Sequence, residues 1–294
     1  MTEGPDGGAA AHRSRDCPAP DAWRFPNPAT PMGSSAYYSL RFAPRDLRDL
    51  RDDLAVLTAW RHQVRMIPDQ VSDPGVARLK LQWWRDELAR AFTGAPHHPL
   101  SRALQPIAAR HGLPQARFSG IADQVEAEIL RRRPADEADL DAACERDLGA
   151  FFELIARCHG RTETDVLRAA RRLGGFCARV YLIRDSGILA RRGRAVFPTE
   201  QLSIHGLSSA TLARREHRER LPELLASAAD RAGTKLATPD RHRGLPVCIR
   251  VRVRILESLL NEIADAGYEV ADRRIGLTPL HKLWLAWRES RRAT

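Results

Sequence analysis

A short stretch in the second half of the chain carries the side chains best suited to chemistry: Arg184-Asp185, followed by Arg191-Arg192-Gly193-Arg194. A guanidinium donates paired hydrogen bonds whose geometry matches phosphate oxygens, so the arginine run is a candidate phosphate-binding turn. The alternative is a turn whose arginines only face solvent. Asp185 is a candidate polar contact in a pocket, or one partner of a structural ion pair with Arg179 or with a neighbour of Arg184.

Other catalytic chemistries lack their sequence patterns. No GxSxG nucleophile elbow, P-loop or GxGxxG glycine pattern is present. The histidines lack the helical spacing of metal ligands, which argues against a histidine metal site. The cysteines form no CxxC pair, and we expect them to be reduced core residues of a cytosolic protein: Cys17, Cys144, Cys158, Cys177 and Cys248.

The elements that must position these side chains are helices. From Pro44 onward, apolar residues recur with helical spacing, first in the stripe Leu47, Leu50, Leu54, Leu57 and Val64. A second helix is expected from a cap at Ser72-Asp73-Pro74 to about Phe92. Further helices are expected at about 99–111, 114–132, 137–159, 162–190, 208–231, 244–267 and 277–291. No stretch alternates with period two, so the predicted fold class is all-α, with one helical domain over residues 35–294.

The flanking sequence and the composition narrow the class of protein. Residues 1–34 are rich in glycine and proline and are expected to form a disordered tail without a secretory signal. No apolar run reaches the roughly 18 residues that a transmembrane helix needs. The net charge is +10, but the arginines are interleaved with acids along the whole chain. This pattern favours solvated helix faces and anionic partners over a nucleic-acid surface.

Three stretches, in this order and at these separations, resemble the squalene/phytoene synthase family: Ser35 to Tyr38 leading through Leu57 to Trp60 and on to Asp69, then Ala77 to Leu88, then Tyr181 to Pro198. The resemblance covers about residues 35–290 and implies an all-α isoprenoid-synthase bundle. Enzymes of this family join two isoprenyl diphosphates head to head. In them, Mg²⁺ held by two aspartate-rich motifs grips the diphosphate, since magnesium prefers oxygen ligands.

The chain departs from the family at both aspartate motifs. The three acids of the first motif fall at Arg65, Met66 and Asp69, so one acid remains. The second motif opens with Asp185, after Arg184 as in the family, but its two later acids fall at Ile188 and Leu189. Tyr181 stands where the family often has an amide. A cation at position 65 opposes a shared metal site, but it could hold a diphosphate without metal.

Such losses are similar to those of a divergent branch that includes phytoene-synthase-like assembly factors of mitochondrial complex I. The phrase Leu81-Gln82-Trp83-Trp84-Arg85 resembles that branch. Neighbouring tryptophans point about 100° apart on a helix, so core packing for one and a helix interface for the other are expected. The alternative is that one of them walls an isoprenoid pocket. Gly174-Gly175, inside an expected helix, predicts close helix packing.

The resemblance leads to one preferred prediction: a non-catalytic factor near the inner membrane that binds an isoprenoid, an isoprenyl diphosphate or a protein partner. The expected localisation is cytoplasmic and peripheral to that membrane, with no cofactor. Its predicted binding residues are Tyr38, Arg65, Asp69, Tyr181, Arg184, Asp185, Arg192 and Arg194. The alternative is an active Mg²⁺-dependent prenyltransferase, with Asp69 and Asp185 as residual metal ligands and Asp86 or Glu126 as a third acid.

Overall fold

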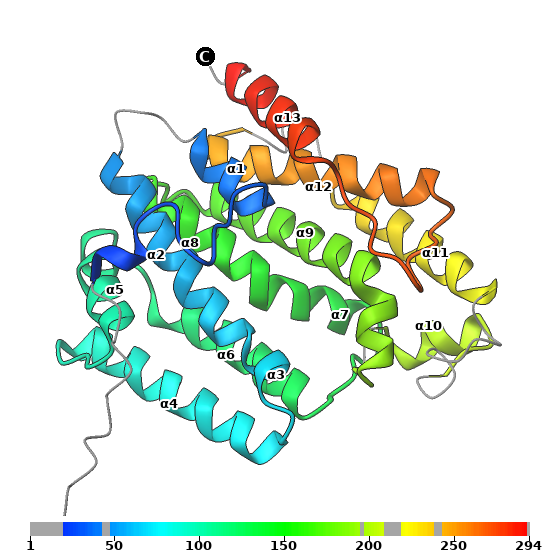
Figure 1. Ribbon diagram of the computed structural model, residues 1–294, viewed down its shortest axis with the longest axis horizontal. Coiled ribbons are helices and arrows are strands. Elements are labelled where there is room, and N and C mark those ends of the chain that lie inside the picture. Colours follow the sequence, from blue (N-terminus) through cyan, green and yellow to red (C-terminus); the bar gives the residue numbers. More distant parts are fainter. Residues whose placement is uncertain (1–19, 43–47, 195–196, 209–218, 238–242, 293–294) are drawn as a thin grey trace, which may run out of the picture.

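The computed structural model describes residues 20–42, 48–194, 197–208, 219–237 and 243–292, and all elements within these ranges are helices (Figure 1). In chain order they are η1 (Pro20–Trp23), α1 (Ser35–Arg41), α2 (Arg48–Arg65), α3 (Ile67–Gln70), α4 (Pro74–Thr93), α5 (Pro99–Arg110), α6 (Gln115–Ile129), α7 (Glu137–Cys144), η2 (Glu145–Gly149), α8 (Ala150–Cys158), α9 (Thr164–Arg191), α10 (Thr199–Ile204), α11 (Leu221–Thr234), α12 (Val247–Asp265) and α13 (Pro279–Arg291). The prediction of an all-α fold is confirmed.

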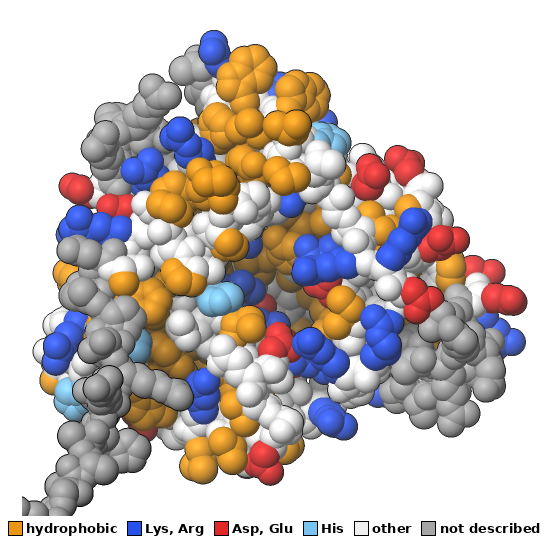
Figure 2. All heavy atoms as spheres, viewed as in Figure 1, with side chains coloured by type: hydrophobic (Ala, Val, Ile, Leu, Met, Phe, Trp, Pro, Cys, Tyr) orange, Lys and Arg blue, Asp and Glu red, His pale blue; other side chains and the backbone are white. Residues whose placement is uncertain are grey.

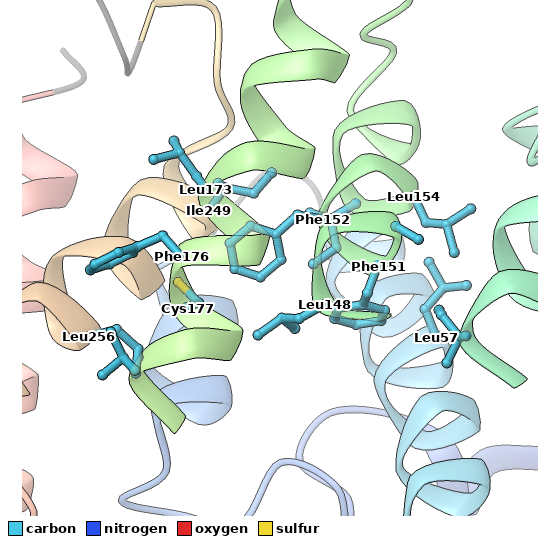
Figure 3. Close-up of a cluster of buried hydrophobic side chains, with 14 of the residues drawn as sticks. Leu57, Leu148, Phe151, Phe152, Leu154, Leu173, Phe176, Cys177, Ile249 and Leu256 are labelled. Atoms are coloured by element: carbon cyan, nitrogen blue, oxygen red, sulfur yellow. The ribbon is translucent and has the colours of Figure 1, made fainter. Parts of the chain in front are cut away.

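The helix α9, 28 residues long, runs through the middle of the molecule (Figure 1). It contacts α7, η2, α8, α11 and α12, so it joins the middle of the chain to two of the later helices. Figure 3 shows how the side chains of this core meet, with Phe176 of α9 near Ile249 of α12 and Phe152 of α8. Burying these apolar side chains supplies the main driving force that holds the bundle together.

Gly174 of α9 and Gly149 of η2 allow these two helices to pack with their backbones in close contact. A methyl group placed on Gly174 would lie 2.4 Å from the carbonyl oxygen of Leu148, and one on Gly149 would lie 2.6 Å from that of Arg171. Both contacts are with backbone, so a larger residue would push the two helices apart. The expectation that Gly174 permits close packing is confirmed. The neighbouring turn η2 is a π-helix, an insertion that interrupts the single helix expected over 137–159.

The expected tail is ordered in its described part. Trp23 is buried, and the side-chain amide of Asn27 donates to the carbonyl oxygens of Trp23, at 2.7 Å, and Ala55, at 3.0 Å. The prediction of disorder is therefore wrong for residues 20–34, since an apolar ring and a satisfied amide anchor the segment to α2. Residues 1–19, including Cys17, lie outside the described residues.

Other expectations hold with shifted boundaries. The cap at Asp73 is present and accepts from the amide of Val76 at 2.8 Å, while Pro44 and Leu47 lie outside the described residues. The helix expected over 208–231 is observed as α11, and residues 209–218 are not described.

Trp84 is buried, whereas Trp83 keeps 43% of its surface exposed. The described cysteines are buried and free, as expected: Cys144, Cys158, Cys177 and Cys248. Across the described ranges, no helix has the length and apolar character needed to cross a bilayer.

Candidate anion-binding site

A cavity of about 440 Å³ opens among α2, α3, α6, α7, η2 and the C-terminal half of α9. Figure 2 shows a hollow near the middle of the viewed face, edged by basic and acidic side chains. Part of the wall is apolar and comes from α7, η2 and α9: Leu140, Ala143, Leu148, Ala178, Leu182 and Leu189. Much of the rest is charged, with more arginines than acids: Arg61, Arg65, Arg132, Arg133, Arg146 and Arg194 against Asp69, Glu128, Asp139, Asp147 and Asp185.

The arginine run that follows α9 reaches the cavity through Asp69. Asp69 Oδ1 accepts hydrogen bonds from Arg192 Nη1, at 2.6 Å, and from Arg194 Nη2. Gly193, with φ of +66°, ends α9 in the left-handed conformation that lets the two arginines reach the same carboxylate. The run is therefore not a turn that only faces solvent, because two of its side chains are bound to α3.

Asp185 is held by arginines on both sides. Its carboxylate accepts from Arg184 Nε at 2.8 Å and from Arg274 Nε at 2.9 Å. Burial would raise the pKa of Asp185, but these guanidinium groups hold it below its ordinary value. The alternative prediction that Asp185 pairs with Arg179 is wrong, because the Arg179 side chain pairs with Glu137 and Asp141. The Arg184 guanidinium also lies 4.7 Å from the centre of the Tyr181 ring.

Arg65 enters the cavity as part of a partly buried charge network. It donates to Glu128 at 2.6 Å and lies 3.5 Å from Asp147, which also accepts two hydrogen bonds from Arg61, at 3.0 and 2.8 Å. Burial would lower the pKa of Arg65, but the carboxylates of Glu128 and Asp147 raise it. Asp147 has a lowered pKa despite its burial, because Arg61 and Arg65 stabilise its charge. Arg65 is therefore permanently cationic.

Four lining arginines are absent from the sequence prediction: Arg61, which pairs with Asp147, and three others. Arg132, Arg133 and Arg146 line the cavity, and none has a carboxylate partner within the described ranges. The Nε of Arg133 is buried and lacks a hydrogen-bond partner among the described residues. Arg131, with φ of +52°, turns the chain after α6, while the π-helix η2 carries Arg146. The run Arg131-Arg132-Arg133 was the available signal in the sequence.

The charged groups suit an anion better than a divalent cation. Mg²⁺ takes oxygen ligands, but Asp69, Asp147 and Asp185 are each already bonded to two arginines. Leu189, at a position where the resemblance predicts a motif acid, lines the cavity with an apolar side chain. Asp86 and Glu126, the acids predicted as a possible third metal ligand, do not line the cavity. Glu126 pairs with Arg78 and Arg85, and Asp86 accepts a hydrogen bond from Gln82. This donor set does not fit magnesium.

The structure brings together most of the residues selected from the sequence. Five of them line the cavity: Arg65, Asp69, Tyr181, Asp185 and Arg194. Arg184 and Arg192 contact the lining acids Asp185 and Asp69. Tyr38 is different, because it is buried in α1 beside Tyr37 and does not line the cavity. An apolar wall beside a cluster of cations can hold a molecule with a hydrocarbon chain and an anionic head.

Comparisons with known proteins agree with this architecture. A presqualene diphosphate synthase of Rhodopseudomonas palustris is 28% identical over 215 residues, which cover 71% of this chain and 74% of the relative. Complex I assembly factor 6 of Bos taurus is 21% identical over 248 residues, covering 81% of this chain and 74% of the relative.

A crystal structure of a dehydrosqualene synthase superposes with a TM-score of 0.74 at 17% identity, covering 88% of this chain and 91% of the other. This likeness confirms the prediction of an isoprenoid-synthase fold. The sequence pattern of the squalene/phytoene synthase family matches residues 30–281. The chain belongs to the squalene/phytoene synthase family.

Proposed function

We propose that this protein is a non-catalytic member of its family that binds an isoprenyl diphosphate in the cavity through arginines, without Mg²⁺. The observation that carries the proposal is the surplus of cations: Arg132, Arg133 and Arg146 line the cavity without carboxylate partners among the described residues. An arginine side chain binds phosphate oxygens through charge-assisted hydrogen bonds. The apolar wall next to these cations would hold the isoprenoid chain, and a cavity of about 440 Å³ is of ligand size.

We propose that the protein is not catalytic because its aspartate motifs differ from those of the family's enzymes. Ionisation of an isoprenyl diphosphate in this family depends on Mg²⁺ bridging carboxylates and phosphates. Arg65 occupies one motif position, and a unit charge about 4 Å away would repel a second one by about 4 kcal/mol at an intermediate dielectric. Asp69 and Asp185 are the remaining motif acids, and arginines neutralise both.

The biological setting that we propose is assembly of a membrane complex. The similarity to complex I assembly factor 6 of Bos taurus supports a protein partner of this kind. We place the protein in the cytoplasm, peripheral to the inner membrane, since an isoprenoid chain partitions into lipid. We propose no nucleic-acid partner for this protein.

A second candidate is an active prenyltransferase that condenses two isoprenyl diphosphates head to head. It is favoured by the 28% identity to the presqualene diphosphate synthase of Rhodopseudomonas palustris. In that case Mg²⁺ would have to displace arginines from Asp69 and Asp185. Product analysis after incubation with farnesyl or geranylgeranyl diphosphate and Mg²⁺ separates the two candidates, because turnover that Asp185→Ala abolishes would establish the enzyme and overturn the non-catalytic proposal.

Isothermal titration calorimetry with the same diphosphates tests binding directly. We expect equal affinity in EDTA and in Mg²⁺, and loss of binding in Arg65→Ala. Arg146→Ala should weaken binding roughly tenfold or more, since a hydrogen bond to a charged group contributes about 1.5–3 kcal/mol. The matched control is Arg168→Ala, an exposed arginine at the other end of α9 that should leave affinity unchanged. Absence of binding in both buffers would contradict the proposal.

A further inference from the structure

The last helix, α13, presents an uncovered apolar face to the outside of the bundle. Leu280 is 76% exposed, Leu283 40%, Trp284 47% and Trp287 48%. Their spacing of three, four and seven positions places them on one side of the helix. Figure 2 shows the corresponding group of hydrophobic side chains at the top of the molecule. Large exposed apolar groups gathered in one place indicate an interaction surface.

The charges around this face are basic. The Arg288 guanidinium lies 4.4 Å from the centre of the Trp284 ring, and the Arg291 guanidinium lies 5.3 Å from that of Trp287. Within α13 the sequence has one acid, Glu289, which is buried and paired with Arg250 at 3.4 Å. The exposed side of the helix therefore combines tryptophan and leucine with cations and carries no carboxylate of its own.

The helix is fixed in this orientation by its opposite side. Leu285 and Ala286 are buried, and α13 contacts both α12 and α1. Lys282 Nζ donates to the carbonyl oxygen of Gly33 at 3.0 Å, and the hydroxyl of Thr278 caps the first turn. Because the inner side is already packed, the outer side cannot turn inward to cover its tryptophans.

We infer that α13 docks the protein on an anionic lipid surface. Tryptophan rings favour the boundary between acyl chains and headgroups, and arginines beside them attract anionic lipid. On α13 the tryptophans and the arginines share the exposed side, so the rings can enter this boundary while the guanidinium groups beside them reach the headgroups. The charge pattern favours a bilayer over a second copy of the chain, whose own α13 would present the same cations. The inference deepens the peripheral membrane location proposed above, but its observations come from α13 and are independent of the cavity.

Co-sedimentation of the full chain with vesicles tests this docking. We expect binding to phosphatidylglycerol–phosphatidylcholine vesicles that is weakened by salt, and little binding to phosphatidylcholine alone. The double variant Trp284→Ser, Trp287→Ser should bind at least about tenfold more weakly, and Arg288→Gln with Arg291→Gln should remove the preference for anionic lipid. The matched control is Trp83→Ser, an exposed tryptophan on α4.

The following results would overturn the inference. Failure of the unchanged protein to bind anionic vesicles would do so, as would an equal loss of binding in Trp83→Ser. Self-association in light scattering that the double variant abolishes, without vesicle binding, would assign the face to a second copy instead. Circular dichroism verifies that the variants are folded. Calorimetry with farnesyl diphosphate on the double variant should be unchanged, so this test and the test of the cavity fail independently.

Discussion

Asp69 and Arg192 are 123 positions apart in the sequence, yet their side chains meet at 2.6 Å across the rim of the cavity. Arg194 binds the same carboxylate. Asp69 therefore occupies two arginines at the edge of the cavity. If the cavity binds a diphosphate as we propose, Asp69 competes with the phosphate oxygens for these arginines.

Replacing that competitor should strengthen anion binding. In Asp69→Asn the carboxylate charge is lost, so Arg192 and Arg194 become available to phosphate oxygens. We expect pyrophosphate and farnesyl diphosphate to bind roughly tenfold more tightly, which corresponds to about 1.4 kcal/mol, measured by calorimetry. Asp165→Asn, which removes an exposed partner of Arg168, is the control. Weaker binding in Asp69→Asn would show that this acid supports the ligand, for example through a metal.

The buried network around Asp147 should contribute stability that depends on pH. Its pKa is lowered in the folded protein, since Arg61 and Arg65 outweigh the effect of burial. The contribution is therefore present above the unfolded pKa of about 3.9 and is lost as pH falls through the lower folded value. Asp147→Asn should reduce the free energy of unfolding at pH 7 by about 3–5 kcal/mol.

Urea denaturation from pH 7 down to pH 3 provides the measurement for Asp147→Asn. The difference between variant and unchanged protein should narrow at the acidic end of this range. A difference that stays constant across the series would mean that lost packing, rather than the charge, causes the destabilisation.

Substitution of Gly174 should disturb the site from a distance. Its added methyl group would collide with the backbone of Leu148 and Gly149, so η2 would have to move, together with Arg146 and Asp147. We expect Gly174→Ala to be destabilising, by about 1–3 kcal/mol or more. Gly233→Ala meets nothing within 4 Å in α11 and should be neutral or stabilising by up to about 1 kcal/mol. Thermal unfolding of both variants provides the comparison, and equal melting temperatures would contradict this account.

The two neighbouring tryptophans of α4 should differ sharply in their effect on stability. Trp84 is 4% exposed, so Trp84→Ala should cost about 3–5 kcal/mol through lost burial and the cavity left behind. Trp83→Ala should change stability by less than about 1 kcal/mol, because its ring remains partly in solvent. Equilibrium unfolding in urea measures both, and similar losses would mean that Trp83 has a packing role that its exposure does not reveal.

The helices could be predicted because their signals are local. Apolar spacing located α4 and α9, and the cap at Asp73 was visible as a residue type followed by proline. Disorder over residues 20–34 was the wrong prediction because glycine and proline content hides the anchoring by Trp23 and Asn27. The π-helix η2 could not be predicted from apolar spacing, since its one extra residue hardly changes the pattern.

The contacts that form the candidate site cannot be predicted from the spacing of residues in the sequence. Arg65, Asp185 and Arg194 were selected through family positions, and the structure does place them around one cavity. Their partners come from distant parts of the chain, as with Arg274 beside Asp185. Arg132 and Arg133 cannot be assigned to the site from the sequence, because they follow the left-handed residue Arg131 in a turn that no apolar periodicity marks.

The hydrogen bond between Lys282 and Gly33 has a consequence for how the bundle comes together. It joins residues 249 positions apart, and α1, which buries Tyr38 and Leu40, contacts α12 and α13. The apolar side of α1 is therefore covered by helices that lie far away in the sequence. Bringing such distant segments together costs chain entropy before their contacts stabilise the fold, so docking of α1 depends on α12 and α13 being formed.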